Sequence, residues 1–506
     1  MTMTIHTLGE ELSNRYRDRV AFTFRADART RQHLTYGQLQ LLSDRMADYF
    51  YRNGITKGHY IGFYCDHPLH TIIAYWACLK LGAICLPLNM EDERYYRVFD
   101  VVAPHAFFVS RTMLPFLRPH LRPNQQIFDD EETVQEAAEA RQTALNSSYD
   151  HPADSDPAFI YFTSGSTGLP KGVMLSQQNI VAYTRYGGKS YTFSSSDRFL
   201  CHAAFHSDMS LFSLFLPLSF GACCQFIHPR HRWNPKHLKT IIEEEGSTSL
   251  FLVPSALRLL LLLLRQDEQL MNVRSVFLSG EKASVHEVQA AQSHFANAQF
   301  YNLYGNTECN DILAFPIPGD TSGFAELPLG IPVPYANTLL LDESFMPCPD
   351  GSVGELYVSS PTMMLGYYGH RLHETSTFIT VPGHPGAFFP TKDLMRCIDG
   401  VYYYVSRRDN MVKVNGQRVY LSMVESIIKQ LPQVSEVAVI ATTRNNRLQL
   451  SAAIYGADIA IPLLRKHCSD NLPSYAVPRS YELHVLPLPK TTTGKIDYET
   501  LKQRLE

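Results

Sequence analysis

The sequence predicts an α/β protein: a large N-terminal region of stacked mixed sheets with helices, a small barrel-like subdomain, and a small α+β C-terminal domain. Three observations support this prediction. Strand-like and helical segments alternate up to about residue 303, short strands separated by Pro and Gly follow from residue 337, and compact mixed segments follow residue 407. The 506 residues, 45% hydrophobic and 19% charged, can bury a large core without cross-links.

The N-terminal elements follow the pattern of a parallel sheet. A strand over 60–65, a helix over 70–81 and a strand over 83–87 have the spacing of a βαβ unit. The other elements predicted here are helices over 11–16, 36–54 and 132–146, and strands over 106–110, 158–163, 249–253, 275–278 and 299–303. The leucines of 259–264 are predicted to lie in a buried helix, because a membrane span needs about 20 apolar residues.

The C-terminal segments are shorter. The runs 338–341 and 354–358 are predicted to form antiparallel strands or a small barrel, since Pro and Gly interrupt them. The elements predicted after residue 407 are helices over 419–431 and 462–472, with strands over 434–441 and 448–454. These elements predict a compact α+β unit.

Composition excludes several functional classes. The 45 basic and 49 acidic residues give a net charge of -4, which argues against a nucleic-acid partner. The ten cysteines form no C-x-x-C pair, so a disulfide framework or zinc ribbon is not expected. We expect a cytoplasmic protein with no membrane partner, because the N-terminus lacks a signal-peptide core. His228-x-x-His231 is interpreted as surface, not as a metal site.

The most specific segment is Tyr161-Phe-Thr-Ser-Gly-Ser-Thr-Gly-Leu-Pro-Lys171-Gly172, in which an apolar strand leads into a loop of Gly and hydroxyl residues. Such a loop presents backbone N–H groups and hydroxyls to an anion, and polyphosphate is the expected ligand. It does not fit the G-x-x-x-x-G-K-[ST] pattern of kinases and ATPases. The candidate nucleotide-binding residues are Thr163, Ser164, Gly165, Ser166, Thr167, Gly168 and Lys171.

This loop resembles the phosphate loop of the adenylate-forming superfamily: acyl-CoA ligases, luciferases and the adenylation domains of nonribosomal peptide synthetases. Four more segments resemble motifs of that superfamily in the same order: Tyr304-Gly-Asn-Thr-Glu308, Thr391-Lys-Asp393, Ser406-Arg407-Arg-Asp409 through Lys413 to Arg418, and Pro489-Lys-Thr-Thr-Thr-Gly-Lys495. The chain departs from the motifs at Asn306, where Pro is usual, and at Lys392 and Ser406, where Gly is usual. The resemblance is strongest to a free-standing amino-acid adenylation enzyme.

The resemblance implies ATP and Mg²⁺ as cofactors and assigns roles to single residues. Lys495 would bridge the substrate carboxylate and the α-phosphate, which fits the need for a cation where two anions meet. Thr307 and Glu308 would serve the α-phosphate, and Glu308 would bind Mg²⁺, which prefers oxygen ligands. The remaining residues assigned to the nucleotide are Tyr304, Asp393, Arg407 and Lys413.

The resemblance also implies two domains. Residues 1–408 would form the large AMP-binding domain and residues 409–506 a small mobile lid. The lid would rotate about Asp409 after adenylation, which would remove Lys495 and open a tunnel for a thiol.

Two interpretations of the acid substrate stay open. Asp208 would pair with the ammonium of an α- or β-amino acid, unless it caps the following helix, whereas Phe205-His206 resembles the gate of aryl- and fatty-acyl-CoA ligases. The amino acid is favoured. Asp311 would be a second carboxylate that either pairs with another cationic group or forms hydrogen bonds with the backbone. The substrate-binding residues carried over by similarity are Asp208, His206, Met209, Phe212, Phe277, Ser279, Leu303, Asp311 and Ile312.

The expected reaction is activation of a small amino-acid carboxylate to aminoacyl-AMP with release of pyrophosphate. Transfer to the phosphopantetheine thiol of a separate carrier protein in natural-product biosynthesis would follow, because no carrier segment follows Lys495. An aryl- or fatty-acyl-CoA ligase that uses CoA is the alternative. A non-catalytic binding protein is disfavoured, since the charged residues of every motif are present.

Overall fold

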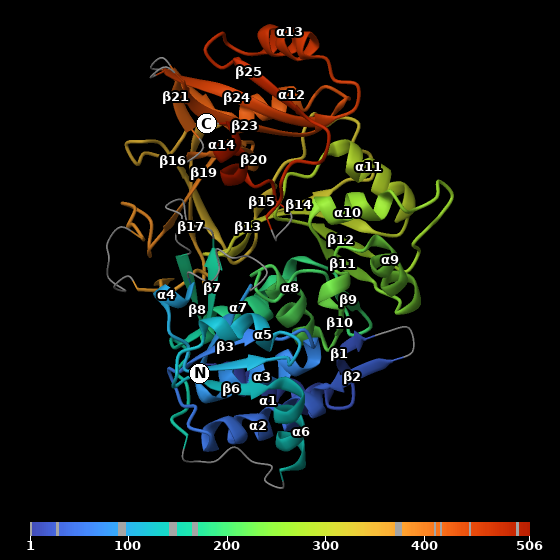
Figure 1. Ribbon diagram of the computed structural model, residues 1–506, viewed down its shortest axis with the longest axis vertical. Helices are drawn as coiled ribbons and strands as arrows, with labels where there is room; N and C mark the ends of the chain where they lie inside the picture. The colour runs from blue at the N-terminus through green and yellow to red at the C-terminus, as the bar shows by residue number, and fades with distance from the viewer. Residues whose placement is uncertain are drawn as a thin grey trace. The chain divides into compact units, whose positions relative to one another are not determined.

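The computed structural model (Figure 1) describes residues 3–26, 30–89, 98–140, 149–163, 171–369, 377–408, 411–414, 417–444, 447–491 and 495–505. The chain divides into two compact units. The first comprises 1–337 and 358–389, and the second comprises 338–357 and 390–506. The large α/β region, the antiparallel subdomain and the small α+β C-terminal part predicted from the sequence are all present. The predicted lid boundary at residue 409 stays a prediction.

A seven-stranded sheet in the first unit contains the predicted βαβ pattern. Its order is β18-β8-β7-β4-β3-β5-β6, and β3 pairs in parallel with both β4 and β5. Its strands are β3 (Tyr60–Tyr64), β4 (Ile84–Pro87), β5 (Ala106–Val109), β6 (Gln126–Asp129), β7 (Pro157–Thr163), β8 (Lys171–Ser176) and β18 (Gly366–Tyr367). The crossover helix α3 (Pro68–Leu81) ends where Gly82 takes a left-handed φ of 72°.

The N-terminal helices pack beside this sheet. They are α1 (Ile5–Tyr16), α2 (Tyr36–Arg52), α4 (Val98–Val101), α5 (Leu114–Leu117) and α6 (Asp130–Glu139). Helix α1 starts six residues earlier than predicted because Thr4 accepts from the backbone N–H of Thr7 in a capping box. The predicted helix 132–146 is confirmed as far as Glu139. Residues 141–148 lie outside the described residues.

A nine-stranded sheet has the order β15-β14-β13-β12-β11-β9-β10-β1-β2, and β9, β11, β12 and β13 run parallel. Its strands are β1 (Val20–Arg25), β2 (Arg31–Thr35), β9 (Arg198–Cys201), β10 (Cys223–Phe226), β11 (Ser249–Leu252), β12 (Ser275–Leu278), β13 (Gln299–Asn306), β14 (Asn310–Ile317) and β15 (Ile331–Pro332). Helices α7 (Gln177–Tyr186) and α8 (Ser210–Phe215) complete this part of the fold. Among these strands, the predicted 249–253, 275–278 and 299–303 are confirmed.

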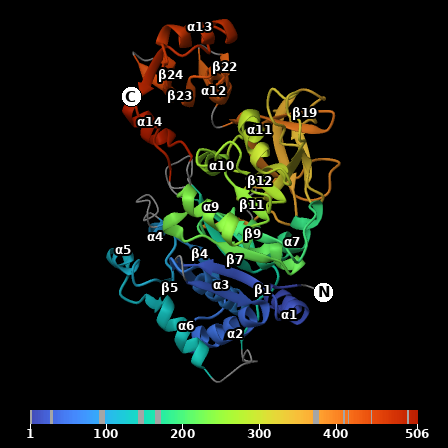
Figure 2. The same ribbon diagram turned by 90° about the vertical axis from the view of Figure 1, so that its right-hand side faces the viewer.

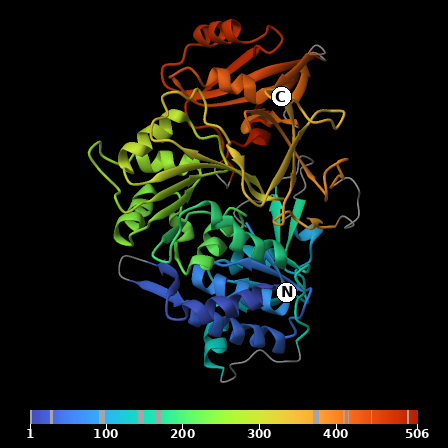
Figure 3. The same ribbon diagram turned by 180° about the vertical axis from the view of Figure 1, so that it is seen from behind.

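Alternate residues of β11, β12 and β13 face opposite sides of this sheet, because side chains along a strand alternate. On the side we call the aliphatic face, Leu250, Leu252, Val276 and Leu278 pack with apolar residues of α9 (Pro235–Glu244), α10 (Pro254–Leu261) and α11 (Val285–His294). The green helices cover this side of the strands (Figure 2; Figure 3). On the side we call the aromatic face, the register joins Phe251, Phe277 and Tyr301.

The leucine run shows that the prediction of a buried helix over 259–264 was partly wrong. Helix α10 ends at Leu261, and its amphipathic turn buries Leu257 and Leu260 while Leu262 is 80% exposed. Among the helices that the structure describes, none combines the length and apolar character needed to cross a bilayer.

The second unit contains three small sheets. The predicted antiparallel region is a four-stranded sheet of β16 (Asn337–Leu341), β17 (Val353–Ser359), β19 (Phe389–Ile398) and β20 (Val401–Arg407). The elements after it are strands β21 (Met411–Val414), β22 (Gln417–Tyr420), β23 (Val434–Arg444), β24 (Arg447–Gly456) and β25 (Ser480–His484), and helices α12 (Leu421–Ile428), α13 (Ile461–Asn471) and α14 (Tyr498–Leu505). Val424, Ile428 and Leu464 belong to the apolar core of this α+β part.

Candidate functional site

The carboxyl ends of β9, β11, β12 and β13 meet at one edge of the nine-stranded sheet, since these strands are parallel neighbours. Open α/β sheets bind ligands at this edge. Asp208 follows β9, Ser279 follows β12, and Leu303 and Tyr304 lie in the last half of β13. Asp311 reaches the same edge from β14, because it pairs with Gly305 in the antiparallel register. Topology thus brings together predicted residues that are about 100 positions apart.

A tight turn joins β13 to β14 and carries Thr307 and Glu308. At Gly305 an added Cβ would lie 2.2 Å from the carbonyl oxygen of Asn310, so only Gly fits this close approach. The backbone N–H of Cys309 donates to Oδ1 of Asn306 at 2.9 Å. Asn306, which replaces the usual Pro of the motif, therefore braces the turn with its own side chain.

Glu308 is tied to Lys171 at the end of the phosphate loop through Tyr367. The Tyr367 hydroxyl donates to Oε1 of Glu308 at 2.8 Å, and Nζ of Lys171 lies 5.5 Å from the centroid of the Tyr367 ring. The backbone N–H of Met364 also donates to the carbonyl of Glu308 at 2.7 Å. The Glu308 carboxylate therefore contacts the hydroxyl of this phenol, and the Lys171 ammonium lies over its ring.

The predicted phosphate loop connects two paired strands. Thr163 at the end of β7 is the antiparallel partner of Lys171 at the start of β8, so these two residues stand at the base of the loop. The predicted loop residues Ser164, Gly165, Ser166, Thr167 and Gly168 lie outside the described residues.

The predicted ribose-binding residues form a pair within the second unit. Asp393 on β19 and Arg407 on β20 are register partners, and Nε of Arg407 lies 3.8 Å from the Oδ1 of Asp393. Lys392, which replaces the Gly of the motif, has a φ of 63°, the left-handed conformation that favours Gly. The backbone of Lys392 donates to Glu355 at 3.2 Å. This conformation turns the chain between the buried Thr391 and Asp393.

Lys495 is exposed in the second unit. The backbone N–H of Thr491 donates to the carbonyl of Lys495 at 2.7 Å. Lys413 lies on β21 opposite Arg418, and its side chain is outside the described part of the structure. The predicted hinge Asp409 is likewise outside the described residues.

The predicted apolar substrate residues lie on both faces of the sheet: Phe212 and Phe277 belong to the aromatic face, whereas Met209 packs against the aliphatic cluster. The Phe212 ring of α8 stacks on Phe251 at 4.3 Å and lies 5.0 Å from Phe277, which in turn stacks on Tyr301 at 4.8 Å. The other predicted members Leu303, Ser279 and Ile312 are buried. The Sδ of Met209 lies 3.1 Å from the position of an added Cβ on Gly280.

The two predicted carboxylates influence each other. Asp208 lies in the turn before α8, whose N-cap residue is Met209 with no side-chain cap bond. Asp311 is 8% exposed and accepts a hydrogen bond from the Tyr183 hydroxyl at 2.7 Å. Burial first, and then the charge of Asp208, raise the pKa of Asp311 to about 6 against the hydrogen bond of Tyr183.

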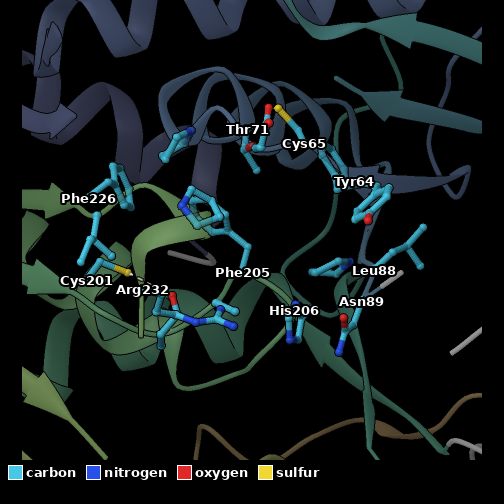
Figure 4. A pocket seen from close by; sticks show the side chains of 18 of the residues that line it. Tyr64, Cys65, Thr71, Leu88, Asn89, Cys201, Phe205, His206, Phe226 and Arg232 are labelled. Carbon is cyan, nitrogen blue, oxygen red and sulfur yellow. Dashed lines mark hydrogen bonds between the residues drawn. The ribbon is translucent and has the colours of Figure 1, made fainter. Parts of the chain in front are cut away.

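A pocket of ≈ 90 Å³ opens between the two sheets of the first unit. Phe205 and His206 line it from the segment after β9, and Tyr64, Cys65 and Asn89 line it from the ends of β3 and β4 (Figure 4). Of the predicted substrate residues, His206 alone lines this pocket, so the sequence-based set covers two distinct places.

Several contact residues were not predicted. Phe251 could have been found once β11 and β12 were placed side by side, because its register partner is Phe277. Tyr367, which links Glu308 to Lys171, and Tyr183, which donates to Asp311, carry no motif. They come from β18 and α7, so only the tertiary fold identifies them.

Comparison with known proteins identifies two family matches. The family model described as AMP-binding enzyme matches residues 10–368, and the model of the AMP-binding enzyme C-terminal domain matches residues 423–495. The chain is 31% identical over 366 residues to the L-proline--[L-prolyl-carrier protein] ligase of Pseudomonas fluorescens, covering 69% of each protein.

Longer relatives and solved structures agree with these matches. The chain is 28% identical over 509 residues to gramicidin S synthase 2 of Brevibacillus brevis, and the match covers 99% of this chain but 11% of that protein. The ATP-bound structure of MatB from Rhodopseudomonas palustris is 20% identical with a TM-score of 0.86, covering 99% of both chains, and shows the same fold.

Proposed function

The chain belongs to the AMP-binding enzyme family of adenylate-forming acid–thiol ligases, and on that premise we propose that it activates an α- or β-amino acid. The carboxylate of the amino acid attacks the α-phosphate of ATP, aminoacyl-AMP forms and pyrophosphate leaves. The phosphopantetheine thiol of a separate carrier protein then attacks the acyl carbon, a thioester forms and AMP leaves. The prolyl-carrier-protein ligase supports this choice of acceptor.

The observation that carries the adenylation proposal is the link from Glu308 through Tyr367 to Lys171. It joins the Tyr-Gly-x-Thr-Glu motif to the base of the phosphate loop. In the proposal Lys171 binds the β- and γ-phosphates of ATP, and Lys495 neutralises the charge that develops between carboxylate and α-phosphate. Asp393 and Arg407 bind the ribose, and the lid of 409–506 carries Lys495 to and from the site.

Glu308 fits a magnesium ion held mainly by substrate phosphates. Its carboxylate is a hard oxygen ligand, and within the described residues no cluster of three His, Cys, Asp or Glu could hold a metal by itself. Mg²⁺ bound there would take its other ligands from phosphates and water, and it supplies charge neutralisation to the pyrophosphate leaving group. Tyr367 keeps the Glu308 carboxylate oriented for that contact.

Asp208 supports an amino acid as the substrate. It stands at the carboxyl edge of the nine-stranded sheet beside buried apolar residues, where a carboxylate can bind the ammonium of an amino acid. The alternative is an aryl- or fatty-acyl-CoA ligase with CoA as acceptor. The observation that favours this alternative is the pocket lined by Phe205 and His206, which resembles a tunnel gate.

Exchange of labelled pyrophosphate into ATP tests both proposals with a panel of amino, aryl and fatty acids. Exchange that requires an amino acid and is lost in Asp208→Ala would support amino-acid activation. Exchange with aryl or fatty acids alone would contradict it in favour of the alternative. The acceptor is then identified by thioester formation with CoA or with phosphopantetheinylated carrier protein.

Lys495→Ala is expected to lower the exchange rate by about 10²-fold or more, because a charge that stabilises the transition state is removed. Lys495 is exposed, so the same variant should unfold at the wild-type temperature. The neighbouring exposed Lys502→Ala serves as the matched control and should keep wild-type exchange. Exchange at the wild-type rate in Lys495→Ala would refute the role of this lysine.

A further inference from the structure

Asp311 is a buried carboxylate with an incomplete set of partners. Its side chain accepts from the Tyr183 hydroxyl at 2.7 Å. The groups that shift its pKa are this phenol and Asp208, and within the described structure no cation is among them. An ionised carboxylate in an apolar enclosure normally has a cationic partner or several hydrogen-bond donors. Asp311 has one donor and a second negative charge nearby.

Two tyrosine hydroxyls near Asp311 also lack hydrogen-bond partners within the described part of the chain. The hydroxyls of Tyr191 and Tyr335 are buried. Burial first, and then the negative charge of Asp311, raise the pKa of each phenol. Among the described residues, neither hydroxyl has a hydrogen-bond partner. A buried hydroxyl without a hydrogen-bond partner lowers the stability of the fold. A polar group of a bound molecule would supply the missing hydrogen bond.

The side chains that pack against Tyr191 are aromatic. The Tyr191 ring meets Phe277 edge-on at 4.8 Å and Tyr301 at 5.0 Å, which places this polar group against the aromatic face. Those rings also belong to the stack that contains Phe212. The Tyr191 hydroxyl, and with it the Asp311 carboxylate whose charge acts on it, therefore border this aromatic cluster.

We propose that Asp311, Tyr191 and Tyr335 form a subsite for a cationic side chain, so that the activated acid is a diamino acid. The inference rests on the proposed function, in which Asp208 binds the ammonium nearer the reacting carboxylate. The ammonium of the side chain then pairs with Asp311 and donates to the two hydroxyls. One substrate with two cations offsets the repulsion between the two carboxylates.

The first experiment compares substrates of equal shape by pyrophosphate exchange. L-Ornithine is paired with L-norleucine, and L-2,4-diaminobutyrate with L-norvaline, because each pair exchanges a terminal ammonium for a methyl group. We expect kcat/KM for a diamino acid to exceed that of its apolar partner by at least ~10²-fold, since the apolar analogue leaves the carboxylate unpaired.

The second experiment removes the charge of the subsite. Asp311→Asn keeps the size of the side chain and an acceptor for Tyr183, and it should lower the preference for the diamino acid by about 10²-fold. Asp320→Asn is the matched control, because Asp320 is an exposed carboxylate after β14, and it should keep the wild-type preference. Thermal unfolding and ATP binding of each variant establish that it is folded.

The outcomes separate the two proposals. A wild-type preference for apolar or neutral polar amino acids, or an unchanged preference in folded Asp311→Asn, would overturn the diamino-acid inference while amino-acid activation stands. Exchange with aryl or fatty acids alone, or with no acid, would overturn both.

Discussion

The two faces of the nine-stranded sheet are built from neighbouring residues of the same strands, yet they differ in chemistry. On β11, Leu250 and Leu252 pack with the aliphatic cluster under α9, α10 and α11, whereas Phe251 between them stacks on Phe212. The aromatic face contacts the ring of Tyr191. Burial first, and then the charge of Asp311, raise the pKa of the Tyr191 hydroxyl. The difference teaches that one face supplies packing stability, whereas the other borders the polar groups to which we assign recognition under the proposed function.

The largest expected effect tests the aliphatic face. Leu250 is fully buried, so Leu250→Ala should lower the free energy of unfolding by about 2–5 kcal/mol through lost transfer energy and a cavity. The KM for the acid substrate should not change, because the helices α9–α11 lie on the face away from Phe251. Chemical denaturation and exchange kinetics measure the two quantities. A changed KM with unchanged stability would refute the separation of the faces.

The pH dependence of stability tests the recognition side. The pKa of Asp311 rises from 3.8 to about 6 on folding, so its stabilising contribution is fully present below about pH 3.8 and is lost as the pH rises through 6. The shift corresponds to about 3 kcal/mol. Asp311→Asn should therefore gain stability relative to wild type between pH 4 and pH 7 in denaturant titrations. A difference that stays constant with pH would contradict the burial of an ionisable Asp311.

A change on the aromatic face should affect recognition more than stability. Phe251→Leu removes the ring that stacks on Phe212 and should cost about 1–2 kcal/mol, because part of the volume is kept. The KM for the acid should change at the same time. Phe251→Leu is compared with Leu250→Ala in the same two measurements. An unaltered KM in Phe251→Leu would contradict the proposed role of the aromatic face in substrate binding.

The smallest effect concerns a residue outside both faces. Lys392 has a φ of 63°, which costs an L-residue about 1–2 kcal/mol relative to a right-handed conformation. Lys392→Gly should relieve this strain and raise the free energy of unfolding by roughly 1 kcal/mol or less, since Gly also gains unfolded-state entropy. A loss of stability would mean that the Lys392 side chain contributes contacts that outweigh its backbone strain.

Much of the fold could be predicted because its elements carry local signals. The βαβ unit around α3 was recognised from the change between strand and helix periodicity, and Gly82 ends the helix as its conformation requires. The prediction of a buried helix over 259–264 was partly wrong, because α10 is amphipathic and Leu262 is exposed to solvent. The adenylation motifs were recognised because each has its charged or hydroxylated residues within a few positions of one another.

What the sequence by itself determined is therefore the class of fold, the phosphate loop and the identity of the charged groups in each motif, since those depend on neighbours along the chain. The tertiary structure decided that Tyr367 joins Glu308 to Lys171 and that Tyr183 donates to Asp311. Those partners lie 59 and 128 residues away in the sequence. These contacts depend on the pairing of strands and on the packing of helices, which bring together residues that are far apart along the chain. Burial and the charge of Asp208 raise the pKa of Asp311 only once the chain has folded.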